Sequence, residues 1–114
     1  MVKGTITRQG IYEDGKNICE IYILNADKNI LPHEYGVKKL IDLIIGKTAY
    51  QAGVHKTKDG VVWISSILYE KGGKRKFRLV DALEANGVNF RDPVILKIVS
   101  SGCYKLELDC IRKC

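Results

Sequence analysis

The sequence predicts a mainly β protein: an open barrel, or pseudobarrel, of about seven strands built from hairpins, with one or two short helices. Three observations favour this class. Turn signals that contain glycine divide the chain at short intervals, the segments between them are rich in β-branched residues, and only one segment has clear helical spacing. No repeat or shift in composition divides the 114 residues, so we expect one domain spanning residues 1–114.

Two segments separated by an Asp-Gly pair at residues 14–15 predict the first hairpin. Residues 4–12 contain Thr, Ile and Tyr, which suit a strand. In residues 17–24, a cysteine and two isoleucines fall on one face, because side chains alternate along a strand. Asn, Asp and Pro mark residues 25–36 as irregular, with a helical turn expected over residues 32–35, since proline suits the first helical position.

The middle of the chain predicts three further strands. Residues 37–45 match helical and strand spacing alike, and we favour a buried strand because the apolar run is short and rich in β-branched side chains. A strand over residues 48–55 follows, and a second Asp-Gly pair then predicts a hairpin into residues 61–68. We expect Trp63 in the core, because a lone aromatic among Val and Ile is usually buried.

The last third of the chain predicts a loop, a helix and a final hairpin. Residues 70–77 read as a polar loop centred on two glycines. Leucines four residues apart predict a helix over residues 79–86, which an Asn-Gly pair ends. Residues 94–99 and 103–110 then predict a hairpin whose second strand alternates apolar and charged side chains, as a strand with one solvated face does.

Composition and charge restrict the functional classes. The 19 Lys and Arg against 13 Asp and Glu give a net charge of +6 and a pI of about 9.2, which permits a polyanionic partner without requiring one. No apolar run approaches the ~18 residues of a membrane span, and the N-terminus has no signal-peptide pattern. We therefore expect a cytoplasmic protein with reduced cysteines and no membrane association.

The sequence contains no nucleotide-binding or nucleophile motif, and we expect no catalytic residue, no cofactor and no metal site. A serine lies within reach of His55 across a hairpin, but no third orienting group for a triad is identifiable. Cys110 and Cys114 lack the second pair, or the nearby histidine, that zinc sites usually need. Asp81 and Glu84 are expected on the solvated face of the short helix.

Three polar segments hold the candidate binding residues. Lys and Arg neutralise phosphates, and a two-stranded ribbon fits the major groove, where Arg and Lys pair with guanine and Asn and Gln with adenine. Charged loops and polar turns also occur in proteins that bind no nucleic acid. The candidates are Arg8, Gln9, Lys16 and Asn17 at the first hairpin, His55, Lys56, Thr57 and Lys58 at the second, and Lys74, Arg75 and Lys76 in the polar loop.

Four segments follow one another between residues 40 and 108: Ile45-Gly46-Lys47-Thr48-Ala49-Tyr50, Val61-Val62-Trp63-Ile64-Ser65, Leu79-Val80-Asp81-Ala82-Leu83 with Gly87, and Asp92-Pro93-Val94-Ile95-Leu96. Through these segments, residues 40–108 resemble the B3-like DNA-binding pseudobarrel, a family that includes plant B3 domains and effector domains of restriction endonucleases. The resemblance implies an open barrel of about seven strands with two short helices, whose two arms grip the DNA major groove. The arms would be residues 12–17, with Arg8 and Gln9, and residues 55–60; both are short, and the second lacks arginine.

The predicted function is binding of duplex DNA without a cofactor, with Lys and Arg on the phosphates and arm residues on the base edges. The main alternative is a β-barrel module that binds another protein, which predicts an exposed apolar patch. Binding of a single strand or of RNA would require Trp63 or the tyrosines to lie exposed on a basic face. A small enzyme would require a pocket that joins His55 to a carboxylate.

Overall fold

In the computed structural model, which describes residues 1–113 and the side chains of residues 1–111, eight strands form a single sheet. The mainly β class predicted from the sequence is confirmed, and three short helical segments accompany the strands. The elements are β1 (Val2–Ile11), β2 (Asn17–Ile23), the 3-10 helix η1 (Asn25–Ile30), β3 (Lys39–Ile45), β4 (Thr48–Lys56), β5 (Val62–Glu70), β6 (Lys76–Arg78), α1 (Leu79–Glu84), β7 (Pro93–Ser100), β8 (Cys103–Leu108) and α2 (Cys110–Lys113).

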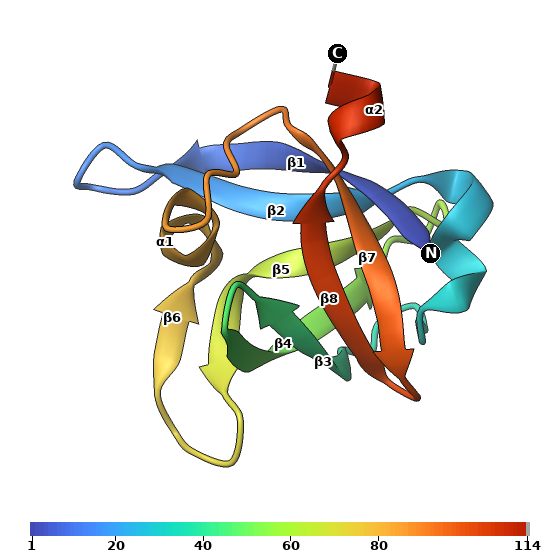
Figure 1. Cartoon of the computed structure of the whole chain (residues 1–114). Helices are drawn as coiled ribbons and strands as arrows, with labels where there is room; N and C mark the ends of the chain where they lie inside the picture. Colours follow the sequence, from blue (N-terminus) through green and yellow to red (C-terminus); the bar gives the residue numbers. More distant parts are fainter. Residues whose placement is uncertain (114) are drawn as a thin grey trace.

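Seven of the strands form a ring, in the order β2-β1-β7-β8-β3-β4-β5 (Figure 1). The sequence predicts an open barrel, whereas β2 and β5 pair antiparallel and close the ring, with Ile21 opposite Ile64 and Tyr22 opposite Trp63. The three-residue strand β6 lies outside the ring, paired with β5. Neighbouring strands are antiparallel except β3 and β8, which belong to different hairpins, so no tight turn fixes their relative direction.

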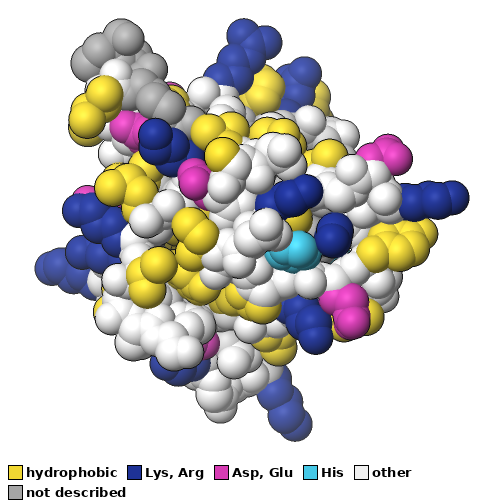
Figure 2. Space-filling view, turned by 90° about the vertical axis from the view of Figure 1, so that its right-hand side faces the viewer, with side chains coloured by type: hydrophobic (Ala, Val, Ile, Leu, Met, Phe, Trp, Pro, Cys, Tyr) yellow, Lys and Arg dark blue, Asp and Glu magenta, His cyan; other side chains and the backbone are white. Residues whose placement is uncertain are grey.

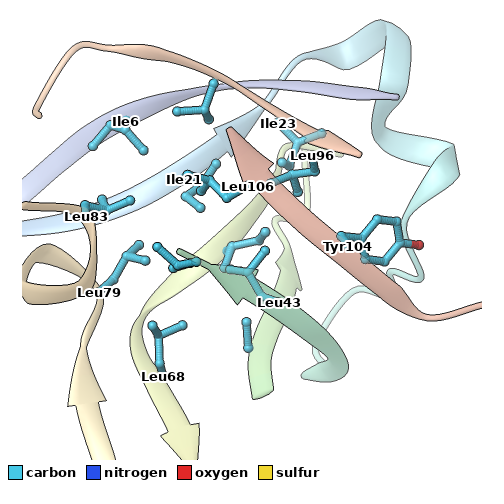
Figure 3. Close-up of a cluster of buried hydrophobic side chains, with 14 of the residues drawn as sticks. Ile6, Ile21, Ile23, Leu43, Leu68, Leu79, Leu83, Leu96, Tyr104 and Leu106 are labelled. Carbon is cyan, nitrogen blue, oxygen red and sulfur yellow. The ribbon is translucent and has the colours of Figure 1, made fainter. Parts of the chain in front are cut away.

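The core fills the inside of this ring. Figure 3 shows side chains from several strands and from α1 converging on the barrel interior. Strand alternation explains the pattern, since Cys19, Ile21 and Ile23 of β2 are all buried, as the sequence predicts. The predicted helix is also present as α1, and its Leu79 and Leu83 are buried against the barrel.

The helical turn in the irregular segment lies earlier than the sequence predicts. It was expected over residues 32–35, but the structure has η1 before this range, and the chain after it forms a tight turn with Glu34 bridged to Val37. Short Asn and Asp side chains favour such turns because they hydrogen-bond to nearby backbone. The Asp27 carboxylate also accepts a 2.9 Å hydrogen bond from the backbone N–H of Lys3, which fastens η1 to β1.

The prediction that Trp63 lies in the core is wrong. Val62 and Ile64 point into the barrel and are buried, so the residue between them points outward. Trp63 is half-buried on the outer surface, where it lines two hollows.

The pairing of β2 with β5 can be tested through the stability of the folded chain. We expect Ile64→Ala to lower the free energy of unfolding by about 2–5 kcal/mol, because Ile64 is fully buried and a cavity would remain. Ile11→Ala, at an exposed position of β1, should change it by less than about 0.5 kcal/mol. Urea unfolding of both variants measures the difference, and equal losses would contradict the closed ring.

Candidate nucleic-acid interface

The turn between β4 and β5 is ordered by a compact set of hydrogen bonds. The Thr57 N–H donates to the Val61 carbonyl at 2.8 Å, and the Thr57 hydroxyl accepts from the Val61 N–H at 3.0 Å. Gly60 has a φ of 90°, which glycine adopts without strain. Lys28 of η1 reaches this turn, where its ammonium donates to the Gly60 carbonyl at 3.3 Å. Thr57 is therefore part of the turn's framework, and Lys56 and Lys58 flank it.

Next to this turn, aromatic side chains lie on the outer surface of the barrel. His55 and Trp63 are partners in the β4–β5 register, and their rings stack with centroids 5.2 Å apart and planes inclined by 19°. Tyr22 lies opposite Trp63 across the strand pair that closes the ring. The residue opposite His55 is therefore Trp63, and not the serine that the sequence suggested as its partner.

Lys38 crosses the same surface because Gly53 leaves room for it. A Cβ atom at Gly53 would lie 2.8 Å from the Lys38 Cδ atom, so a side chain there would displace the lysine. The Lys38 ammonium donates a 3.0 Å hydrogen bond to the Tyr69 hydroxyl and lies 4.6 Å from the centre of its ring. This hydrogen bond lowers the pKa of Tyr69, since it stabilises the ionised phenol.

The charges around this turn are mostly cationic. Burial, and then Lys38, lowers the pKa of His55; burial, and then Lys56 and Lys28, lowers the pKa of His33. Both histidines are thus mainly neutral at pH 7, because burial and the nearby lysines both disfavour the charged ring. Four lysines near this turn form no ion pair with a carboxylate of the described residues. They are Lys28, Lys38, Lys56 and Lys58.

A shallow groove of about 340 Å³ joins these features. We call it the basic groove; Tyr35, Lys38, His55, Lys56 and Trp63 line it, together with residues 36–37. Tyr35 is 62% exposed, so its ring is available to a ligand. Trp63 also lines a second hollow of about 280 Å³, and Glu20 is among the other residues that line it.

The first hairpin tip has a different environment, because Lys16, the candidate cation at this tip, is already paired. The Lys16 ammonium lies 2.8 Å from the Asp81 carboxylate and 3.4 Å from that of Glu84, both on α1. The hydrogen bond to Asp81 raises the pKa of Lys16. Arg78 pairs with Asp14 at 2.7 Å. The helix carboxylates expected to be merely solvated therefore neutralise Lys16 of the predicted first arm.

The other candidates of the first hairpin are dispersed around this tip. The Arg8 guanidinium lies 5.2 Å from the centre of the Phe90 ring, and Arg91 lies 5.1 Å from the same ring. Gln9 is exposed at a β-bulge. Asn17 lines a hollow beside α1.

The predicted basic loop, with Lys74, Arg75 and Lys76, is exposed at the end of β5 remote from the β4–β5 turn (Figure 1). The nine residues of β5 separate the two by about 25–30 Å. Arg75 lies over the Phe77 ring at 5.2 Å. In Figure 1 the β1–β2 turn lies on the left with α1, whereas the β4–β5 turn lies on the right beside η1. The structure thus keeps the three predicted segments apart.

The second predicted segment gains several further residues that suit binding. Figure 2 views this side of the molecule and shows Lys and Arg side chains around the visible histidine, with hydrophobic surface between them. Sequence reasoning missed Lys28, Lys38, Tyr35 and Tyr69 and assigned Trp63 to the core. Strand alternation could have placed Trp63 outside, since Val62 and Ile64 share the opposite face. No sequence signal points to Lys38, whose position depends on Gly53.

Comparison of the chain with protein-family models, with curated proteins and with solved structures found no match. The resemblance to B3-like domains therefore stays a prediction. Within the described residues, no group of three or more His, Cys, Asp or Glu side chains could hold a metal ion, and no helix is long and apolar enough to cross a membrane. Cys114 of the C-terminal cysteine pair lies outside the described residues.

The two histidines predict how stability depends on pH. Their pKa values are lowered in the folded chain, so the unfolded chain binds more protons as the pH falls below 6.5. We expect the free energy of unfolding to decrease between pH 7 and about pH 5.5, and His55→Asn to reduce that decrease. Urea unfolding at several pH values measures it, and a gain in stability on acidification would contradict the assigned environments.

Proposed function

We propose that this chain is a DNA-binding domain that holds backbone phosphates at its β4–β5 end. The observation that supports this most is the grouping of lysines without ion pairs around the basic groove, while Lys16 of the first hairpin tip pairs with α1. These lysines are Lys56 and Lys58 at the β4–β5 turn, Lys28, which reaches Gly60 of that turn, and Lys38, whose ammonium donates to Tyr69 of β5. Cations that are not already neutralised are the ones that release counterions from DNA.

The net charge of +6 supports the same proposal, because it raises the local concentration of a polyanion before specific contacts form. The β4–β5 hairpin is a narrow two-stranded ribbon, the shape that a major groove admits. Lys58, exposed at its tip, and Lys56, at its base, are positioned to contact phosphates. We propose one arm, at residues 55–60, rather than two, because the first tip lies at the other end of the barrel.

The salt dependence of binding tests this proposal with a matched pair of variants. Lys56→Ala/Lys58→Ala removes two cations at the proposed site, and Lys47→Ala/Lys105→Ala removes two exposed lysines elsewhere. We expect the site variant to lower the affinity for random duplex DNA about tenfold or more at low salt and to reduce the salt slope by about 2.

Fluorescence anisotropy of a labelled duplex across a salt series gives both values. The control variant should lose less than about threefold. Equal losses in the two variants would show that only net charge matters, and failure of the unmodified chain to bind at low salt would contradict DNA binding.

A second candidate is a protein-binding module, and a set of exposed apolar side chains favours it. Leu40, Ile98 and Val99 are each more than half exposed. The β3–β8 register places the start of β3 beside the β7–β8 turn, so these side chains lie at one end of the sheet. Exposed apolar patches on a soluble surface frequently mark contacts with proteins.

Self-association through this patch can be measured directly. We expect sedimentation at increasing concentration to show an increase in mass that Leu40→Lys/Ile98→Lys abolishes, because burying unpaired ammonium groups is costly. Ile11→Lys, at another exposed apolar position, is the control. A mass that stays monomeric at every concentration would contradict a self-associating patch.

A further inference from the structure

We propose that the basic groove binds an unpaired base of a single nucleic-acid strand, with the base against Tyr35 and Trp63 and the adjoining phosphates at Lys38 and Lys56. This inference rests on the proposed function and specifies which form of nucleic acid the same end of the barrel prefers.

The aromatic surface is the first reason. Tyr35 and Trp63 line the same groove, and Tyr35 is largely exposed. The His55 ring is stacked on Trp63, with the two ring centroids 5.2 Å apart. A flat base entering the groove therefore meets Trp63 and His55 already ordered by strand pairing, and base stacking on aromatic side chains tolerates any sequence.

The position of the lysines is the second reason. Lys38 and Lys56 line the groove with the aromatic residues, so cations and aromatic rings lie in one groove. Lys38 is held in place, because its stem lies on Gly53 and its ammonium donates to Tyr69. A single strand needs both kinds of side chain, since each base is joined to a charged phosphate. The same two ammonium groups repel a cationic ligand.

The size of the groove is the third reason. Its volume of about 340 Å³ is near the lower end for small-molecule pockets, which suits a single base. In a duplex, each base is paired and stacked, so its flat face is not available to Tyr35 or Trp63. An unpaired base can turn its face toward the protein. The groove therefore distinguishes single strands from duplexes, while the lysines alone do not.

The chain offers a direct optical test, because Trp63 is its only tryptophan. We expect a fifteen-residue oligo(dT) or oligo(rU) to quench the Trp63 fluorescence on binding, since a stacked base quenches indole emission. A duplex of the same length, bound through phosphates alone, should quench much less. Titration with dTMP separates the strand from a free nucleotide, because dTMP has the base but lacks the second phosphate contact.

Variants at Tyr35 test the stacking contact without disturbing the core, since this side chain is largely exposed. We expect Tyr35→Ala to weaken oligo(dT) binding about fivefold or more, and Tyr35→Phe, which keeps the ring, to bind as the unmodified chain does. Trp63→Leu should weaken it likewise, as measured by anisotropy of a labelled strand. Duplex affinity should change by less than about twofold in all three variants.

The outcomes separate this inference from the function on which it rests. Equal affinity for single and double strands, with no effect of the Tyr35 and Trp63 substitutions, would overturn the stacking groove and leave DNA binding intact. Binding of dTMP as tightly as oligo(dT) would show a nucleotide pocket and would also overturn it. Failure of both strands and duplexes to bind at low salt would overturn the inference and the proposed function together.

Discussion

The pairing of β2 with β5 is the constraint on which the rest of the structure depends. It places Ile21 opposite Ile64 and Tyr22 opposite Trp63, so one pair faces the core and the other faces the outer surface of the sheet. The isoleucines are fully buried and seal the core, whereas the aromatic pair is forced outward by strand alternation. A barrel left open between these strands would expose core residues and would have no fixed outer surface around Trp63. The candidate site is thus a consequence of ring closure.

Charge is divided between the two ends of the barrel in a way that composition does not reveal. At the α1 end, Lys16 is paired with Asp81 and Glu84, and Arg78 is paired with Asp14. These contacts hold the first hairpin tip against the helix, so they serve packing more than recognition. At the β4–β5 end, the lysines group around neutral histidines instead. The net charge of +6 is therefore less informative than its distribution, because only unpaired cations are free to meet a polyanion.

Most of the fold was predictable from local patterns, and most of the site was not. The hairpins follow from Asp-Gly turns and strand alternation, and α1 follows from its leucine spacing, because these signals act over a few residues. The β4–β5 hairpin that carries His55 and Lys56 was predicted from such a signal too. Ring closure escaped prediction because it pairs strands more than 40 residues apart, such as Ile21 with Ile64. The neutralisation of Lys16 by Asp81 is a contact of the same long-range kind.

The basic groove shows why such sites resist prediction from periodicity. At Gly53 the β4–β5 register shifts between residues 52 and 54, so the regular ladder is interrupted there. Because Gly53 of β4 has no side chain, the stem of Lys38 occupies the space above it. The Lys38 ammonium then reaches Tyr69 on β5. A glycine usually weakens a strand, but Gly53 leaves space for the Lys38 side chain to lie against an aromatic surface. The chemistry of the groove arises where the β pattern is broken, because an unbroken strand would place a side chain over the position that the lysine needs.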